Sequence, residues 1–290
     1  MLFLLKKQRK EEESMRKIFL LIVLFTAVVT VSACSTESGF DITSETEIVV
    51  GLEAAYAPFN WATPTENGFT VPIANQTGFY ADGFDVVMAQ EIADALGLTL
   101  VIRAIEWDGL IPALLAGEID LIIAGMSPTS ERAQTVAFSD PYFQSEQVMV
   151  VRNDGNYADA TSLDDFNGAR IVAQLGTLQD DLIDQITGVN HQAALNDYAS
   201  LVTALLNNAS DGFVAELPVA MGIVAANSNL SFITFTDGSG FTVTPEDVTV
   251  SVALRQEDTT LLSAINDALN AISTETRNDY MEAALTRQPQ

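Results

Sequence analysis

From residue 47 onward, the spacing of hydrophobic positions alternates between two periods. Short apolar runs at residues 47–52, 99–105 and 119–124 predict β-strands. Residues 84–97 and 107–117 repeat apolar positions every three or four residues, which predicts amphipathic helices. Strands that alternate with helices at this spacing are typical of an α/β sheet.

The helix predicted over residues 84–97 has recognisable ends. We expect Asp85 to be its N-cap and Gly97 to terminate it. Its apolar face consists of Val87, Met88, Ile92 and Leu96. Residues 66–78 before it are rich in Gly, Pro and Asn and predict an exposed loop.

The same alternation restarts after residue 146, which predicts a second α/β unit. Its strands are expected at residues 147–152, 169–175, 211–217 and 248–254. Helices are expected at residues 177–186, 200–208, 218–227 and 258–273, with Pro218 in a first turn. The last of these is strongly amphipathic through Leu261, Leu262, Ile265, Leu269 and Ile272. Two units of about 100 residues each suit a chain of 290 residues.

The N-terminal residues indicate export. Met15, Arg16 and Lys17 provide a positive start, and residues 18–31 are apolar. That run is shorter than the roughly 20 residues of a membrane-spanning helix, the alternative interpretation. The sequence VSAC, ending at Cys34, resembles a bacterial lipobox and implies cleavage before Cys34 and a lipid on its sulfur.

This interpretation divides the first 46 residues into two parts. Residues 1–33 are expected to be a leader with a lipoprotein signal peptide, and translation is expected to start at Met15, because the charged residues before it do not suit such a signal. Residues 34–46 are polar and predict a flexible, lipid-anchored tether. The protein would then be held at the outer face of the bacterial cell membrane.

The charged residues and the single copies of Cys and His exclude several classes of site. One Cys excludes a disulfide framework, and one His makes a His-based triad or zinc site improbable. Six of the thirteen cations and three of the 39 acids precede Cys34, which leaves seven arginines, no lysine and 36 acids. From Cys34 onward the formal charge is therefore 7 − 36 = −29. Such a negative charge disfavours nucleic acid as a partner. An acidic, lysine-free surface also favours the hypothesis of a saline medium.

One of these seven arginines follows a buried strand. After residues 119–124, Gly125 allows close backbone approach, and Ser127 and Thr129 provide donors at an expected helix start. Arg132 adds a planar fork that matches a carboxylate. The segment therefore predicts an anion site. The alternative is a surface ion pair of Arg132 with Glu131.

Five segments resemble the family 3 solute-binding proteins, the amino-acid receptors of bacterial ABC importers. They are GLEAAYAPFNW (51–61), GFDVVMAQEIADALG (83–97), EWDGLIPALLAGEIDLIIAGMSPTSERAQTVAFSDPYF (106–143), LGTLQ (175–179) and DGFVAELPVA (211–220). The resemblance covers about residues 47 to 285. It implies an α/β, two-lobe clamp of the type II periplasmic-binding-protein kind, each lobe a central sheet flanked by helices. Lobe 1 would be residues 47–145 plus 248–290 and lobe 2 residues 146–247, with hinge crossings near Ser145 and Val248.

The resemblance also implies roles for particular residues. Arg132 would bind the ligand α-carboxylate, with main-chain N–H groups of Ser127 and of Leu178 beside Thr177. The Gly125 carbonyl, the Ser127 hydroxyl and Glu216 would bind the α-ammonium group. Glu216 stands where many members have aspartate, and its alternative role is a solvated acid at a strand end.

A second set of residues would surround the ligand side chain. Tyr56 and Trp107 fall where the family has aromatic walls, although Trp107 also suits core packing. Glu53 occupies a position where relatives use aspartate for polar or cationic side chains. Gln174 would reach the side chain, and Ala124 would line the pocket. Phe59 and Trp61 suit either the cleft or the core.

The expected function is that of a lipid-anchored extracellular receptor, not an enzyme. It would bind lysine, arginine, histidine or glutamine and deliver it, as a monomer, to an ABC permease with a cytoplasmic ATPase. No catalytic residue, cofactor or metal is expected. The alternatives are a prephenate- or arogenate-type dehydratase on the same fold, which needs a general acid over its substrate, and a ligand-sensing domain. The sequence does not define the amino acid, its affinity or the permease.

Overall fold

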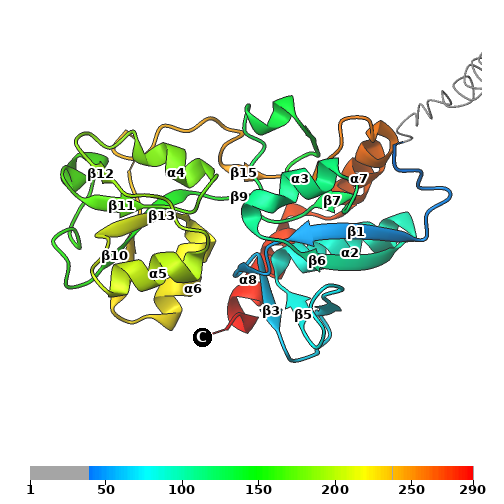
Figure 1. Cartoon of the computed structure of the whole chain (residues 1–290), viewed down its shortest axis with the longest axis horizontal. Helices are drawn as coiled ribbons and strands as arrows, with labels where there is room; N and C mark the ends of the chain where they lie inside the picture. The colour runs from blue at the N-terminus through cyan, green and yellow to red at the C-terminus, as the bar shows by residue number, and fades with distance from the viewer. Residues whose placement is uncertain (1–38, 237, 290) are drawn as a thin grey trace, which may run out of the picture. The chain divides into compact units, whose positions relative to one another are not determined.

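The computed structural model describes residues 39–236 and 238–289 (Figure 1). Residues 39–290 form one compact unit. The expected leader, the start at Met15 and the lipidation of Cys34 lie outside the described residues.

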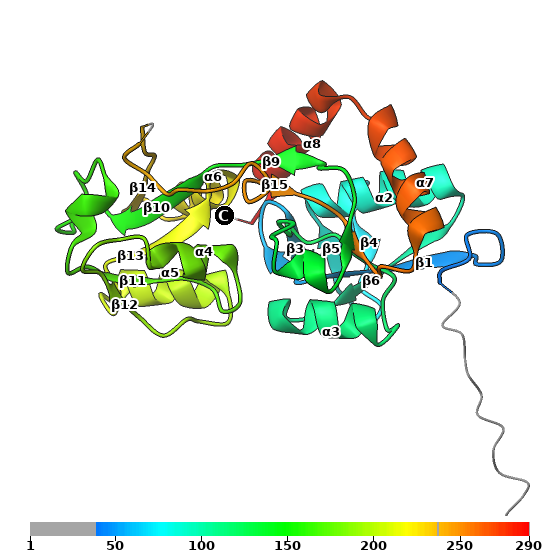
Figure 2. The same cartoon turned by 90° about the horizontal axis from the view of Figure 1, so that it is seen from above.

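The first sheet has β1 near its centre, because that strand is apolar on both faces. Its five strands follow the order β6 (Thr99–Ala104), β1 (Glu47–Leu52), β7 (Leu121–Ile122), β16 (Ala253–Leu254) and β8 (Ala137–Phe138). β1 is parallel to β6 and β7, as expected for strands joined by helices. The covering helices are α2 (Phe84–Leu96), α3 (Leu110–Leu115), α7 (Thr259–Ala271) and α8 (Thr274–Arg287). In Figure 2, α3 lies on one side of β1, and α2 with α7 lies on the other.

A smaller four-stranded sheet adjoins α2. It consists of β2 (Ala55–Tyr56), β3 (Asn60–Thr63), β5 (Tyr80–Asp82) and β4 (Val71–Pro72) in that order. The loop predicted over residues 66–78 is mostly exposed but contributes β4 to this sheet. The sheet positions the segment that carries Tyr56.

The second large sheet belongs to the other lobe. Its order is β12 (Asn190–His191), β11 (Arg170–Val172), β13 (Gly212–Glu216), β10 (Gln147–Arg152) and β14 (Leu230–Ile233). Its helices are α4 (Leu178–Ile183), α5 (Tyr198–Leu206) and α6 (Leu217–Ala226), and a 3₁₀ turn, η3, covers Leu163–Phe166. β10 and β13 are buried along almost their whole length because helices cover them, which explains their continuous hydrophobic runs.

The two lobes are joined by a pair of crossing segments. β9 (Phe143–Gln144) runs antiparallel to β15 (Thr249–Val250), and the Ser145 N–H donates to the Val248 carbonyl at 2.8 Å. The strand predicted over residues 248–254 is therefore two strands, β15 at this crossing and β16 in the first sheet. The residue limits of the lobes stay a prediction.

The start of α2 differs from the prediction. Gly83 is the N-cap, and Asp85 lies inside the first turn, where it is completely buried. The expected N-cap at Asp85 is therefore wrong, because the helix begins one residue before it. Val86 replaces Val87 on the buried face beside Met88 and Ile92, and Gly97 ends the helix with φ 70° as predicted.

The described part of the expected tether is packed on the protein. The Phe40 N–H donates to the Asp258 carboxylate at 2.6 Å, and the side chains of Phe40 and Ile42 contact the hydrophobic core. Residues 39–46 are therefore held in place rather than free. Two apolar side chains within the polar segment provide this contact.

The C-terminal end of α8 reaches the second lobe. Gln288 is buried, and its side chain lies against Gly222 of α6 so closely that a Cβ there would be 2.3 Å from its Oε1. Figures 1 and 2 show the C-terminal end of α8 directed toward α6. α8, which the hydrophobic pattern did not predict, thus contacts both lobes.

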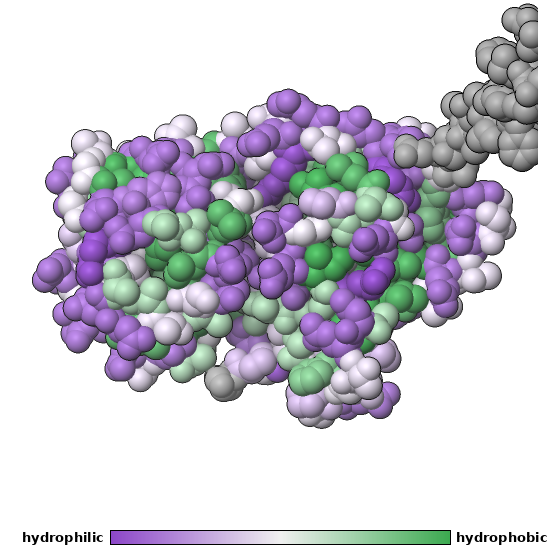
Figure 3. All heavy atoms as spheres, viewed as in Figure 1, coloured by the Kyte–Doolittle hydropathy of each residue, from purple (hydrophilic) through white to green (hydrophobic). Residues whose placement is uncertain are grey.

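Polar residues cover most of the face in Figure 3, with hydrophobic side chains in smaller patches on both lobes. Within residues 39–236 and 238–289, none of the helices combines the length and apolar character needed to cross a membrane.

Gly83 supports a test of this fold. A Cβ at this position would lie 2.2 Å from the Phe59 carbonyl oxygen, and its φ of 132° disfavours every other residue. Gly83→Ala is expected to lower the free energy of unfolding by about 3 kcal/mol or more. The matched control, Gly97→Ala, also has positive φ but meets no atom within 4 Å, so about 1 kcal/mol is expected. Denaturant unfolding of both variants measures the difference, and equal losses would contradict this packing.

Candidate ligand-binding site

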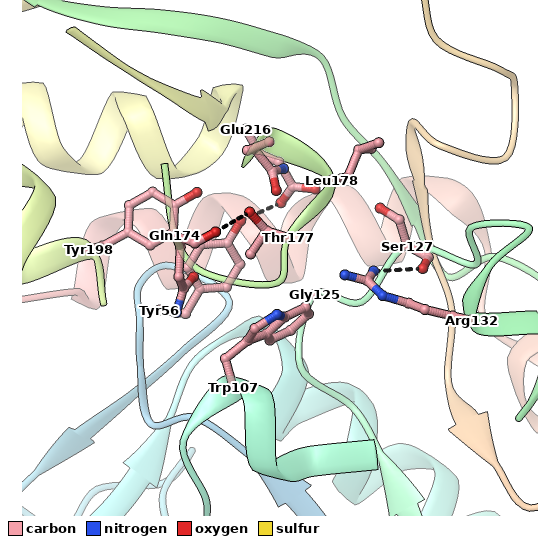
Figure 4. Close-up of a pocket in the computed structure, with 11 residues that line it drawn as sticks. Tyr56, Trp107, Gly125, Ser127, Arg132, Gln174, Thr177, Leu178, Tyr198 and Glu216 are labelled. Atoms are coloured by element: carbon pink, nitrogen blue, oxygen red, sulfur yellow. Dashed lines mark hydrogen bonds between the residues drawn. The ribbon is translucent and has the colours of Figure 1, made fainter. Parts of the chain in front are cut away.

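A small pocket lies between the two lobes (Figure 4). Eleven residues line it: Tyr56, Trp107, Gly125, Ser127, Arg132, Gln174, Thr177, Leu178, Gln179, Tyr198 and Glu216. Nine of them were predicted. Glu53 and Ala124, also predicted, do not line it, whereas Gln179 and Tyr198 were missed.

Arg132 extends its guanidinium group into this pocket. Its Nη1 donates to the Ser127 carbonyl at 2.9 Å, and its Nη2 donates to the Gly176 carbonyl of the other lobe at 3.2 Å. Burial lowers the pKa of Arg132, although nearby acids, Asp181 first, oppose this shift. Among the described residues it forms no ion pair with a carboxylate, so the alternative of a surface pair with Glu131 is wrong. A half-buried cation without a carboxylate partner is suited to an anionic ligand.

The segment before Arg132 differs from the expected helix start. Residues 127–129 are irregular, and Arg132 begins only a short 3₁₀ turn, η2 (Arg132–Gln134). The argument from a helix dipole at this position is therefore wrong. Two Arg132 hydrogen bonds to carbonyl oxygens orient the fork instead.

Glu216 provides the opposite charge from the second lobe. It ends β13, precedes the first turn of α6, and is only 2% exposed. Its Oε2 accepts a hydrogen bond from the Tyr56 hydroxyl at 2.7 Å. Burial raises the pKa of Glu216 to about 7, while the Tyr56 hydroxyl and the charge of Arg132 lower it. The alternative of a solvated strand-end acid is wrong.

Aromatic rings form one side of the pocket. Tyr56 stacks on Phe59 with ring centres 5.2 Å apart and contacts Tyr198 at 5.0 Å. Trp107 faces them, and its ring nitrogen donates to the Gly176 carbonyl at 3.0 Å (Figure 4). The Arg132 guanidinium carbon lies 5.1 Å from the Trp107 ring centre. Trp107 is thus a pocket residue rather than core filler.

The sequence left open whether Phe59 and Trp61 belong to the cleft or to the core, and both lie in the core. Phe59 is completely buried and Trp61 is 5% exposed, and neither lines the pocket. Ala124 is buried behind the pocket surface.

Glu53 lies beside the pocket, behind Gln174. The Gln174 Nε2 donates to Glu53 at 2.8 Å and to the Asn196 carbonyl at 2.9 Å, which connects the two lobes. Burial raises the pKa of Glu53 to about 7 against the opposing Gln174 hydrogen bond, and Asp197 adds to the rise. Glu53 therefore contributes a second carboxylate at the edge of the site.

The backbone on both lobes comes close to the pocket. Gly125 has φ of 63°, and a Cβ there would lie 2.8 Å from the Tyr56 ring, so the tyrosine packs directly on the main chain. Across the pocket, Thr177 caps α4 by accepting from the Asp180 N–H at 3.3 Å. This cap leaves Leu178 at the first helical position.

The two missed residues differ in how far the sequence signals them. Asp197 caps α5 by accepting from the Ser200 N–H at 2.7 Å, which places Tyr198 in the first turn, two residues before the predicted start. An N-cap predicted at Asp197 would have placed Tyr198 at the start of this helix. Gln179 donates to Gln147 at 3.0 Å, a pairing that no local pattern indicates. Within the described ranges, no group of three metal-ligating side chains is arranged for a metal ion.

Comparison with known proteins agrees with this architecture. The model of the bacterial extracellular solute-binding proteins, family 3, matches residues 48–283. A probable histidine-binding protein of Campylobacter jejuni is 33% identical over 222 residues, covering 75% of this chain and 80% of that protein. An arginine-binding extracellular protein of Bacillus subtilis is 26% identical, covering 88% and 92%.

Solved structures show the same fold. An amino acid ABC transporter substrate-binding protein from Streptococcus pneumoniae bound to L-arginine has a TM-score of 0.73 and 27% identity, covering 84% of this chain and 96% of that chain. The α/β two-lobe clamp is thereby confirmed. The chain belongs to the bacterial extracellular solute-binding proteins, family 3.

Proposed function

We propose that this protein is a receptor for a polar L-amino acid, with preference for a cationic side chain, and that it delivers its ligand to an ABC importer. The observation that carries the proposal is the presence of Arg132 and Glu216, from different lobes, in one pocket. An amino acid carries a carboxylate and an ammonium group a few bonds apart. The pocket provides a group of opposite charge for each, the half-buried Arg132 for the carboxylate and the buried Glu216 for the ammonium group.

In this proposal, the ligand backbone bridges the two lobes. Arg132 binds the α-carboxylate, together with the main-chain N–H groups of Ser127 and of Leu178 beside Thr177. Glu216 binds the α-ammonium group, with the Gly125 carbonyl and the Ser127 hydroxyl. These groups supply both charge and directed hydrogen bonds, so a molecule without either group is disfavoured.

The ligand side chain is proposed to lie among Tyr56, Tyr198 and Trp107, toward Gln174 and Glu53. Aromatic faces attract cations, and the Glu53 carboxylate adds negative charge beside them. Both features favour lysine, arginine or histidine. Relatives include histidine- and arginine-binding proteins, but also cystine- and glutamine-binding ones, so family membership alone leaves the ligand open.

Contacts between the lobes support capture by closure. Tyr56 donates to Glu216, Trp107 and Arg132 both donate to the Gly176 carbonyl, and Gln174 donates to Glu53. A ligand that touches both lobes stabilises the same closed arrangement and excludes water from the ion pairs. This proposal has no chemical step, and we propose a binding protein rather than an enzyme.

The cellular setting is proposed from the sequence and the family. A lipid on Cys34 would hold the protein at the outer face of the cell membrane. It would present its ligand, as a monomer, to a membrane permease with a cytoplasmic ATPase.

The direct test is the thermal stability of the purified protein with each of the twenty L-amino acids. A ligand that binds only the folded state stabilises it by about 4 kcal/mol at a thousandfold excess over Kd. We expect a large rise in Tm with one or a few amino acids, cationic ones first. An unchanged Tm with all twenty would overturn the proposed ligand class.

Replacement of Arg132 tests the carboxylate site. Arg132→Gln is expected to weaken binding of the amino acid by about 100-fold, because a buried charge-assisted pair is lost. The matched control is Arg103→Gln, since Arg103 bonds the Glu118 carbonyl away from the pocket. Calorimetric titration of both variants measures Kd. Equal losses would show that Arg132 has no special role.

The pH dependence tests the two carboxylates. Because burial raises the pKa of Glu216 and of Glu53 to about 7, both are largely protonated below that pH and cannot pair with a cation. Affinity for a cationic amino acid should rise up to about pH 7 and then level off. Without ligand, stability should fall as the pH rises from 4.5 to 7, because the unfolded carboxyls, with pKa 4.5, release protons first.

Glu53→Gln separates the two groups. The variant should retain the Glu216 part of the pH profile with a shallower slope and should weaken lysine or arginine more than glutamine. Titrations between about pH 5 and pH 8 bracket both carboxyl groups and measure both effects. Equal weakening of every amino acid would show that Glu53 only shapes the cleft.

A further inference from the structure

Asp85 is a buried carboxylate outside the pocket. It is the second residue of α2 and is completely buried. Among the ion pairs of the described residues, none includes Asp85. An unpaired buried carboxylate is costly unless hydrogen bonds satisfy it. Its hydrogen bonds should therefore indicate why it is present.

One oxygen of Asp85 supports the segment after β1. The Asn60 Nδ2 donates to it at 2.8 Å, and the Asn60 Oδ1 accepts from the Ala54 N–H at 2.7 Å. Ala54 has φ of 57°, a conformation that a residue other than glycine rarely adopts. Ala54 lies between Glu53 and Tyr56 in sequence. Asn60 thus transmits the position of Asp85 to the turn that carries both residues.

The other oxygen supports the segment after β7. The Tyr142 hydroxyl donates to Asp85 at 2.7 Å and accepts from the Gly125 N–H at 3.3 Å. The Gly125 backbone packs against the Tyr56 ring, so the two supported segments touch each other. One carboxylate therefore supports two lobe 1 segments that line the pocket.

Tyr142 also connects this network to the crossing between the lobes. Its N–H donates to the Val250 carbonyl at 2.9 Å, and it directly precedes β9. Its side chain is 1% exposed, so solvent cannot replace its hydrogen bonds without unpacking. Tyr142 thus bonds the Gly125 backbone through its hydroxyl and the Val250 backbone, at the crossing between the lobes, through its main-chain N–H.

We propose that Asp85 is a positioning residue of the ligand-binding site: through Asn60 and Tyr142 it holds the Glu53–Tyr56 turn and the Gly125 backbone in their ligand-binding arrangement. It does not touch the ligand. The inference rests on the proposed function for its effect on affinity, but the hydrogen-bond chain can be tested without any ligand.

The chemistry explains why a carboxylate is needed. Asp85 accepts from two donors that face it from different segments. An asparagine would present one acceptor and one NH₂ group. Either that NH₂ faces the Asn60 NH₂, so that two donors meet, or it faces Tyr142, whose hydroxyl proton then has no acceptor. In both cases one of the two connections is lost, with little change in volume.

The chain offers a matched control in Asp82. This carboxylate is 2% exposed and lies three residues earlier. It accepts from the Gly83 N–H at 2.7 Å, from Asn67 at 3.1 Å and from Arg287 at 3.0 Å, and none of these donors lines the pocket. Asp82→Asn and Asp85→Asn thus remove one buried carboxylate each from the same region.

The experiment compares the two variants by hydrogen exchange of the peptide that contains residues 121–127 and by Kd for the amino acid that the wild type binds. In Asp85→Asn we expect faster exchange at Gly125 and about tenfold weaker binding. Asp82→Asn is expected to lower Tm while leaving both quantities unchanged. Tyr142→Phe removes only the hydroxyl and should reproduce the Asp85→Asn effects, with no further loss in the double variant.

Each outcome decides the proposal. Unchanged exchange and Kd in Asp85→Asn, or equal changes in Asp82→Asn, would reduce Asp85 to a stabilising residue and overturn it. If Asp85→Asn does not fold, the same two measurements on Tyr142→Phe confirm or overturn the positioning role. If the wild type binds none of the amino acids, the proposed function fails, and exchange at Gly125 still tests the hydrogen-bond chain by itself.

Discussion

Two groups of opposite charge in one pocket, the half-buried Arg132 and the buried Glu216, constrain the rest of this structure. Burial lowers the pKa of Arg132 and raises that of Glu216, so each charged form loses stability inside the protein. Neither has an ion-pair partner among the described residues. In the proposed function, a zwitterion would supply the missing counter-charge to both groups at once. Because the two residues belong to different lobes, a ligand bound to both would also favour closure of the lobes.

The fold provides the rigid supports that this arrangement needs. Glu216 ends a buried strand, and Arg132 follows one through an irregular segment whose Ser127 carbonyl helps to orient the guanidinium group. The paired crossing of β9 and β15 carries the chain between the lobes outside both five-stranded sheets, so the cleft can change while both sheets remain intact. Loops at the ends of well-packed strands carry many of the residues that line the pocket, and their precision depends on buried hydrogen bonds beneath them.

The sequence predicted the large elements because their signals are local. Periodicity located β1, α2 and α7 and gave Gly97 as the end of a helix, and the family resemblance placed nine pocket residues. Non-local effects account for the misses. Ser251 donates to the Met126 carbonyl, which interrupts the predicted strand over 248–254. Glu53 bonds Gln174, which lines the pocket in its place. Aspartate is a residue type that often caps helices, but the packing around Asp85 makes it a buried hydrogen-bond acceptor inside the first turn. None of these depends on neighbouring residues in sequence.

The contact of Gln288 with Gly222 ties the segment after α8 to the second lobe. Gly222 lies in α6 of one lobe, whereas Gln288 follows α8 of the other, and a Cβ at position 222 would fall 2.3 Å from the Gln288 Oε1. Because that oxygen is the far end of a flexible side chain, a larger residue at 222 would displace the glutamine rather than the backbone of either lobe. Glycine at this one position therefore lets the segment after α8 fasten to the second lobe, separately from the groups that line the pocket.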